Sequence, residues 1–181
     1  MDTIGFLEVT SIAKGVEISD AMLKSSYVKL VFSRASCPGK YYVMVTGDVS
    51  GVETSVKEGL NIGKGFVVYS TVLPKIHPQV FSAINAGIIP DSVPALGIME
   101  FYSVTASLTA ADKAAKTARV DIMDIRLGTG IGGKSFVLLA GELTSVKSAV
   151  EAAINTLKDS GMLVSQAVIS NPKKELVEAL Y

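Results

Sequence analysis

The chain has little of what disulfide-bonded, nucleic-acid-binding or membrane-spanning proteins require. Its 181 residues include one cysteine, so no internal disulfide can form, and a reducing cytoplasm fits best. The 17 basic and 17 acidic residues cancel, which gives no reason to expect nucleic acid or an anionic membrane as a partner. Polar or turn residues interrupt every apolar run before the roughly 20 residues that a membrane span needs. The first residues also lack the features of a signal peptide, so we expect a cytoplasmic protein.

The single histidine, His77, limits the catalytic chemistry that the sequence can support. No Asp, Glu or Cys stands near it at ligand spacing, and the sequence shows no Ser-His-Asp or metal-hydrolase constellation around it. Glu8 and Glu100 occur in matching contexts, and this repetition favours a structural hydrogen bond over a catalytic carboxylate pair. We therefore predict that the protein is not an enzyme. Because 49% of the residues are hydrophobic and the net charge is zero, we expect an oligomer.

The clearest feature that is present is an internal repeat. A shift of 92 positions places GFLEVTS (5–11) on GIMEFYS (97–103), with Gly, Glu and Ser matched. After two further residues in the second copy, a shift of 94 places Gly39-Lys40 on Gly133-Lys134. The turn residues of 85–96 suit a linker. The repeat predicts two modules, residues 1–88 and residues 95–181.

Each copy has the same predicted order of elements. In the first copy we expect strands at 4–10, 28–33, 41–46 and 66–73, and helices at 16–26 and 49–61. Either Asp48 or Ser50 is the candidate N-cap of the second helix. The order β-α-β-β-α-β predicts an α+β protein of two tandem ferredoxin-like modules, each with an antiparallel sheet and both helices on one face.

Several segments resemble a known family. They are GFLEVTSIAKGVEISDAMLKSS, CPGKYYVMVTGDVSGV and VVYSTVLPKIH in the first copy, and GIMEFYSVTASLTAADKAAK and IGGKSFVLLAGELTSV in the second. The chain resembles the bacterial microcompartment shell proteins of the tandem-domain, trimer-forming type, and most of all the propanediol-utilisation type that carries an iron–sulfur cluster. The resemblance implies a pseudo-hexameric homotrimer, a structural tile that contacts other shell proteins at its edges in the shell of a cytoplasmic microcompartment.

In that family the loop between the second and third strands lines a central pore. The residues that the resemblance places there are Ser36, Cys37, Pro38, Gly39 and Lys40, and we add Gly130 and Gly132 of the second copy. A lone cysteine is usually a small buried hydrophobe. The resemblance instead implies that three Cys37 thiolates around a threefold axis bind a 4Fe–4S cluster, with Pro38 and Gly39 leaving amides free for its sulfides. The implied function is electron relay across the shell; the alternative is a cluster-free tile whose pore passes small metabolites.

A competing motif lies in the second copy. Residues 128–135, GTGIGGKS, match the Walker A pattern, which binds phosphate where a glycine-rich loop leads into a helix. The following residues, 136–140, are all apolar and predict a strand instead. A phosphate- or nucleotide-binding protein therefore remains a less favoured hypothesis.

The resemblance also identifies candidate contacts between tiles. Lys24, Lys75 and His77 occupy positions that the family uses at the tile edge. Lysine replaces the usual arginine at Lys75 and offers fewer donors. Lys24 could equally be an ordinary solvated lysine on a helix, and His77 a surface residue rather than a metal ligand.

Overall fold

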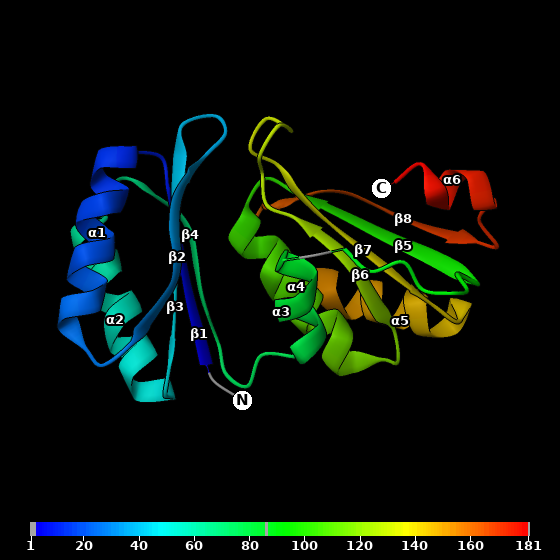
Figure 1. Cartoon of the computed structure of the whole chain (residues 1–181), viewed down its shortest axis with the longest axis horizontal. Helices are drawn as coiled ribbons and strands as arrows, with labels where there is room; N and C mark the ends of the chain where they lie inside the picture. Colours follow the sequence, from blue (N-terminus) through cyan, green and yellow to red (C-terminus); the bar gives the residue numbers. More distant parts are fainter. Residues whose placement is uncertain (1–2, 86, 181) are drawn as a thin grey trace. The chain divides into compact units, whose positions relative to one another are not determined.

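The computed structural model describes residues 3–85 and 87–180 and contains two four-stranded sheets (Figure 1). The elements of the first copy are β1 (Thr3–Val9), α1 (Ile12–Ser25), β2 (Lys29–Ser36), β3 (Lys40–Gly47), α2 (Val49–Ile62), β4 (Val67–Leu73) and α3 (Pro78–Asn85). Those of the second copy are β5 (Ala95–Phe101), α4 (Val104–Thr117), β6 (Asp121–Arg126), β7 (Ser135–Gly141), α5 (Leu143–Leu157), β8 (Leu163–Ser170) and α6 (Lys174–Glu178).

The two sheets have the same topology and the same register. Their strand orders are β2-β3-β1-β4 and β6-β7-β5-β8, with antiparallel neighbours throughout. Gly5 pairs with Val45, and its equivalent Gly97 pairs with Leu139. Register irregularities also recur at equivalent places in both sheets. The predicted ferredoxin-like plan and the repeat are therefore confirmed.

Contacts divide the chain into two compact units whose limits differ from those of the sequence repeats. The first unit is 1–76 together with two short segments of the second copy, 103–106 and 128–133. The second unit is 77–102, 107–127 and 134–181, and so includes α3. The fold thus places the start of α4 and the β6–β7 loop in the first unit, beside residues of the first copy.

In the first unit, α1 and α2 cover one face of the sheet (Figure 1). The core between these layers is formed by side chains that alternate along β1 and β3 and by the apolar stripes of the two helices. Its buried members are Leu7, Val9, Ile18, Met22, Tyr41, Val43, Val45, Val52 and Val56. The expectation that both helices lie on one face is confirmed for this unit.

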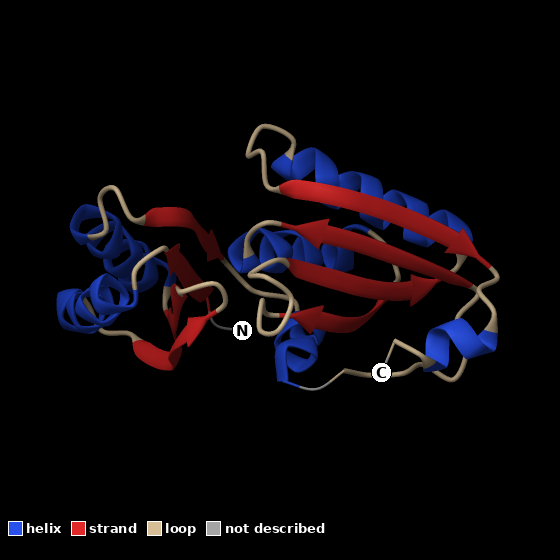
Figure 2. Cartoon of the chain, turned by 90° about the horizontal axis from the view of Figure 1, so that it is seen from above, coloured by secondary structure: helices blue, strands red, loops and turns tan. Residues whose placement is uncertain are grey.

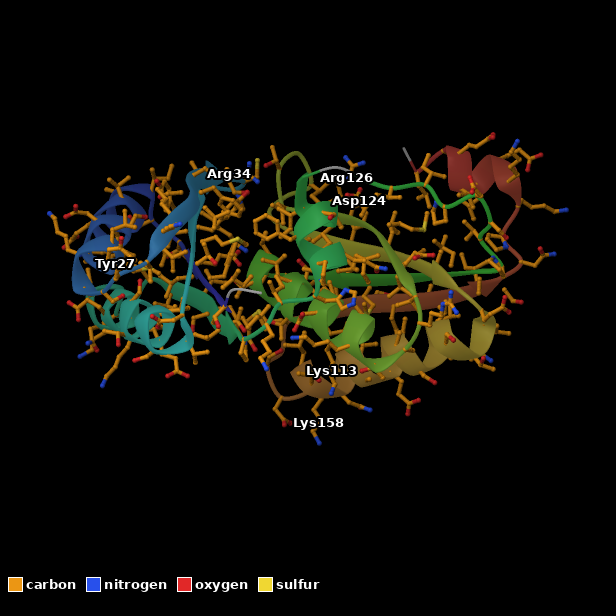
Figure 3. The ribbon with its side chains drawn as sticks, turned by 60° about the horizontal axis from the view of Figure 1, so that its bottom comes forward. Tyr27, Arg34, Lys113, Asp124, Arg126 and Lys158 are labelled. Atoms are coloured by element: carbon orange, nitrogen blue, oxygen red, sulfur yellow. The ribbon has the colours of Figure 1, made fainter. Side chains whose placement is uncertain are left out.

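The opposite face of the same sheet carries an aromatic cluster. The rings of Phe6 and Tyr42 stack at 5.7 Å between centroids, and both meet Phe32 edge-on. The guanidinium of Arg34, labelled in Figure 3, lies 4.8 Å from the Phe32 ring centroid, within cation–π range. Its equivalent in the second copy, Arg126, instead bonds the Asp124 carboxylate on the same strand.

The second unit has helices on both faces of its sheet. Helix α5 packs on β5, and the short α6 lies on the other face, where Val177 joins a core cluster with Leu96 and Leu138 (Figure 1). Helix α3 packs on the edge strand β6, and the Gln79 side-chain oxygen accepts a hydrogen bond from the Ile122 amide at 3.1 Å. Figure 2 shows the strands side by side with α5 running along the sheet.

Sequence patterns placed most elements within a few residues; the start of α1 differs, and two short helices were not predicted. Helix α1 begins at Ile12 rather than at Val16, because Ser11 caps it by accepting a hydrogen bond from the Lys14 amide. Asp48, one of the two candidates, is the N-cap of α2. Helices α3 and α6 were not predicted, because each is too short to show a clear apolar period. Within the described residues, no helix is long and apolar enough to cross a membrane.

Candidate functional site

Cys37 lies in the tight turn that joins β2 to β3. The Gly39 amide donates to the Ser36 carbonyl at 3.0 Å, which closes the turn around Cys37 and Pro38. The Cys37 thiol is unbonded and partly exposed. Gly39 has φ +93°, and no heavy atom of the described residues beyond its chain neighbours lies within 4 Å of the place where a Cβ would stand. The turn therefore presents a partly exposed free thiol and has open space at Gly39.

The loop between β6 and β7 packs against this turn. Gly130, Gly132 and Gly133 all have positive φ, which glycine adopts without a steric cost. A Cβ on Gly133 would stand 2.4 Å from the Cys37 carbonyl oxygen and 2.5 Å from Cδ of Pro38. Only glycine fits this approach of two backbones, so the second loop supports the turn that carries the thiol.

Lys40 joins the two loops to the sheet. Its Nζ lies 2.8 Å from Oε1 of Glu8 and also donates to the Gly133 carbonyl at 3.3 Å. Only 17% of the Lys40 side chain is exposed, although the sequence places it beside the predicted pore. Its amino group is therefore committed to a buried carboxylate and to the neighbouring loop.

Glu8 is the buried centre of this arrangement. Its side chain is fully buried on β1, where an uncompensated charge would be strongly unfavourable. Oε2 accepts hydrogen bonds from Ser103 Oγ at 2.6 Å and from the Thr105 amide at 3.3 Å, at the start of α4. A helix N-terminus favours an anion because its first amides lack partners within the helix.

We call the set Glu8, Lys40, Ser103, Thr105 and Gly133 the first latch. All of its members belong to the first compact unit. The structural hydrogen bond that the sequence predicts for Glu8 is confirmed. The partners were not predicted, although Lys40 and Ser103 both recur in the other copy and could have been paired with the glutamate on that ground.

The second copy holds the matching pair in an exposed setting. Lys134 Nζ lies 3.0 Å from Glu100 Oε1, with 43% of the Lys134 side chain and 35% of the Glu100 side chain exposed. Both residues belong to the second unit. The same pair of residue types is thus buried in one copy and open to solvent in the other.

Comparisons with known proteins agree with the duplicated fold. The BMC domain matches residues 3–76 and again residues 95–172. The chain belongs to the bacterial microcompartment shell proteins. It is 41% identical to the shell protein PduT of Citrobacter freundii over 173 residues, 96% of this chain and 94% of that one.

Solved structures of shell proteins show the same architecture. A crystal structure of a microcompartments protein from Desulfitobacterium hafniense DCB has a TM-score of 0.83 and 46% identity, covering 98% of this chain and 99% of the other. A fused permuted hexameric shell protein of the RMM microcompartment has a TM-score of 0.66 over 87% of this chain and 81% of its own. Its 21% identity supports the fold alone.

The Walker A hypothesis fails on the element that follows the loop. In this shell protein Lys134 is followed directly by the strand β7, and the next helix, α5, begins only at Leu143. The glycine loop therefore leads into no helix N-terminus that could bind a phosphate. The amino group of Lys134 is paired with Glu100.

The three predicted edge residues of the shell protein are not members of the latch. Lys24 is exposed at the end of α1 and bonds Asp20. Lys75 is exposed with φ +49°, directly before α3. The His77 amide donates to the Asp112 carboxylate at 2.8 Å, while its ring Nδ1 is buried with no hydrogen-bond partner among the described residues. Their role as tile contacts stays a prediction.

One chain by itself offers a single thiolate ligand for a metal. Among the described residues there is no group of three or more His, Cys, Asp or Glu side chains that could hold an ion. The partly exposed Cys37 thiol is a suitable donor for iron in an iron–sulfur cluster, but a cluster ordinarily takes four thiolates. The donor chemistry fits, provided that several chains contribute.

Proposed function

We propose that this chain is a structural tile of a bacterial microcompartment shell, assembled as a homotrimer whose three Cys37 side chains bind a 4Fe–4S cluster at the central pore. The observation that carries the proposal is the placement of the one thiol on an open turn, in a chain whose two copies share a single shell-domain fold. Its edges, with Lys24, Lys75 and His77, would contact neighbouring shell proteins.

The cluster part of the proposal is supported by the local geometry of the turn. There is open space at Gly39, and the turn contacts Gly133, whose carbonyl accepts a hydrogen bond from Lys40. Three thiolates would hold three irons and leave the fourth to a ligand from outside the protein. When bound, the cluster would supply redox chemistry for electron transfer across the shell, and hydrogen bonds from the turn would tune its potential.

The experiment is an anaerobic purification of the wild type and of Cys37→Ser, with iron and sulfide analysis and sedimentation. We expect about four irons per three chains in the wild type, and none in the variant, with the trimer mass unchanged. Iron retained in Cys37→Ser would show that the ligand assignment is wrong. A wild-type mass below that of a trimer would remove the tile proposal itself.

The second candidate is the same tile without a cluster, whose pore passes small metabolites. The turn of Cys37 is compatible with it, because the thiol is free and only partly exposed. An iron-free trimer after anaerobic purification would favour this candidate. In either case we propose a structural role rather than catalysis, as the relative's name, shell protein, indicates.

A further inference from the structure

Two contacts that the first copy makes to the second within the chain have equivalents that the described residues of a single chain do not make. Glu8 is buried against Ser103 at the start of α4, whereas its equivalent Glu100 is exposed. The equivalent of Ser103 is Ser11, at the start of α1. A single chain therefore presents a partly exposed carboxylate, Glu100, in its second copy and a helix start without a carboxylate partner among the described residues, at Ser11, in its first copy.

The two helix starts have the same cap but different burial. Ser103 Oγ accepts from the Ala106 amide and donates to Glu8, while Ser11 Oγ accepts from the Lys14 amide in the same way. Apolar residues near the two caps differ in exposure. Ile12 and Val16 are 47% and 54% exposed, and their equivalents Val104 and Leu108 are 1% and 0% exposed. Ile12 and Val16 thus form an exposed apolar surface on α1 of the kind found at protein interfaces.

A second pair of equivalent surfaces also has one member buried and the other exposed. Helix α3 packs on β6, with Val80 and Ile122 buried. Its equivalent is α6, because Lys75 and Asn171 precede the two helices at matching positions and share φ near +48°. On α6, Leu176 in the place of Val80 is 43% exposed.

The strand that would receive α6 is also uncovered. Leu30 on β2 is the equivalent of Ile122 on β6, and it is 46% exposed where Ile122 is 2% exposed. The covered surfaces are those where an element of the first copy contacts the second copy: Glu8 at the start of α4, and α3 on β6. The open surfaces are the equivalent ones, which would be covered if the second copy made the same contacts to the first copy of another chain.

We propose that Glu100 and Lys134 form a second latch on another copy of this chain, in a head-to-tail interface. Glu100 would accept from Ser11 Oγ and the start of α1 of that copy, and Lys134 would donate to its Gly39 carbonyl. Helix α6 would lie on its β2. This inference rests on the proposed trimer and specifies which residues form the contact between its subunits. A head-to-tail contact of this kind forms a closed ring when the rotation between subunits is a whole fraction of a turn.

The second latch would complete the turn that carries Cys37. Gly39 occupies the place of Gly133 and has open space around it, whereas Gly133 touches the other loop. In the ring, Gly39 would meet Ile131 and Gly132 of the neighbouring copy, the equivalents of Cys37 and Pro38. Lys134 would thus act as a positioning residue, holding each cysteine turn from the neighbouring subunit.

The experiment measures trimer dissociation by sedimentation and, for very tight trimers, by the rate of subunit exchange between labelled trimers. The variants are Glu100→Gln, Lys134→Met and the reversed pair E100K/K134E, with the exposed Lys158→Met as the matched loss of one charge (Figure 3). We expect Glu100→Gln and Lys134→Met each to raise the dissociation constant or exchange rate about tenfold or more, with Lys158→Met within about twofold.

The reversed pair separates a latch from a mere ion pair. In E100K/K134E the two side chains still attract each other, but the residue that faces the start of α1 is now a cation. Because a helix N-terminus favours an anion, we expect the double variant not to restore trimer stability. Ser11→Ala combined with Glu100→Gln should cost less than the sum of the two, because both remove one contact. Three results would each overturn the second latch. They are a dissociation constant of the single variants equal to that of the wild type, full recovery of the trimer by E100K/K134E, and strictly additive effects of Ser11→Ala and Glu100→Gln. The first two results would leave the trimer proposal standing, whereas a monomeric wild type would remove both.

Discussion

The two copies contain the same glutamate and lysine at equivalent sequence positions, yet only the glutamate of the first pair is fully buried. Glu8 and Lys40 have 0% and 17% of their side chains exposed, and Glu100 and Lys134 have 35% and 43%. The register of the central strands does not explain this difference, because Glu8 pairs with Tyr42 and Glu100 pairs with the equivalent Phe136. What differs is whether a helix start and a glycine loop lie beside the pair.

The comparison teaches that the surroundings of an ion pair decide its energetic role. An exposed pair contributes about 0–1 kcal/mol, because water solvates both partners. Removing one partner of a buried pair costs about 3–5 kcal/mol, because the other charge is left without compensation. The same substitution in the two copies is therefore expected to have different consequences for the single chain.

The largest expected effect is that of Lys40→Met. It leaves Glu8 buried beside Ser103 without its cation, and we expect a loss of about 3–5 kcal/mol in the free energy of unfolding. Lys134→Met is the matched variant, and for the dissociated chain we expect about 1 kcal/mol or less. Urea unfolding at a concentration where both are monomeric measures the difference. Equal losses would mean that the burial of the first latch has no energetic weight.

A second substitution compares the two glycine loops. Gly133→Ala places a Cβ 2.4 Å from the Cys37 carbonyl, in addition to the positive φ, whereas Gly39→Ala meets only the backbone cost. An alanine at a left-handed position costs about 1–2 kcal/mol, and we expect Gly133→Ala to exceed this because backbone must move. Thermal unfolding of the dissociated chains measures both. A smaller effect for Gly133→Ala would contradict the close packing of the loops.

The sequence was sufficient to predict the fold because the signals of each copy reinforce one another. The period-2 strands, the Cys37 hairpin and the strand after Lys134 were all found, and the last one correctly argued against a phosphate loop. The repeat also pointed to Glu8 as structural. These features depend on local patterns, which a sequence displays directly.

The latch partners were not predicted from local patterns, because they lie far apart in the chain. Glu8 meets Ser103 across 95 positions and Lys40 meets Gly133 across 93. Nothing in the local pattern distinguishes Glu8 from Glu100, although one is buried and the other exposed. Only the fold decides which of two equivalent residues is enclosed.

The smallest expected effect comes from the two caps. Ser103→Ala removes both a helix cap and a hydrogen bond to the Glu8 carboxylate, and Ser11→Ala removes a cap alone in the dissociated chain. A cap is worth about 1 kcal/mol and a hydrogen bond to a charged group about 1.5–3 kcal/mol. We therefore expect Ser103→Ala to be the more destabilising by about 1–2 kcal/mol, with Thr105 retaining part of the contact to Glu8. Urea unfolding checks the order, and a trimer should narrow the gap, because Ser11 would then bond Glu100 of its neighbour. A gap of the same size in monomer and trimer would indicate that Ser11 gains no partner on assembly.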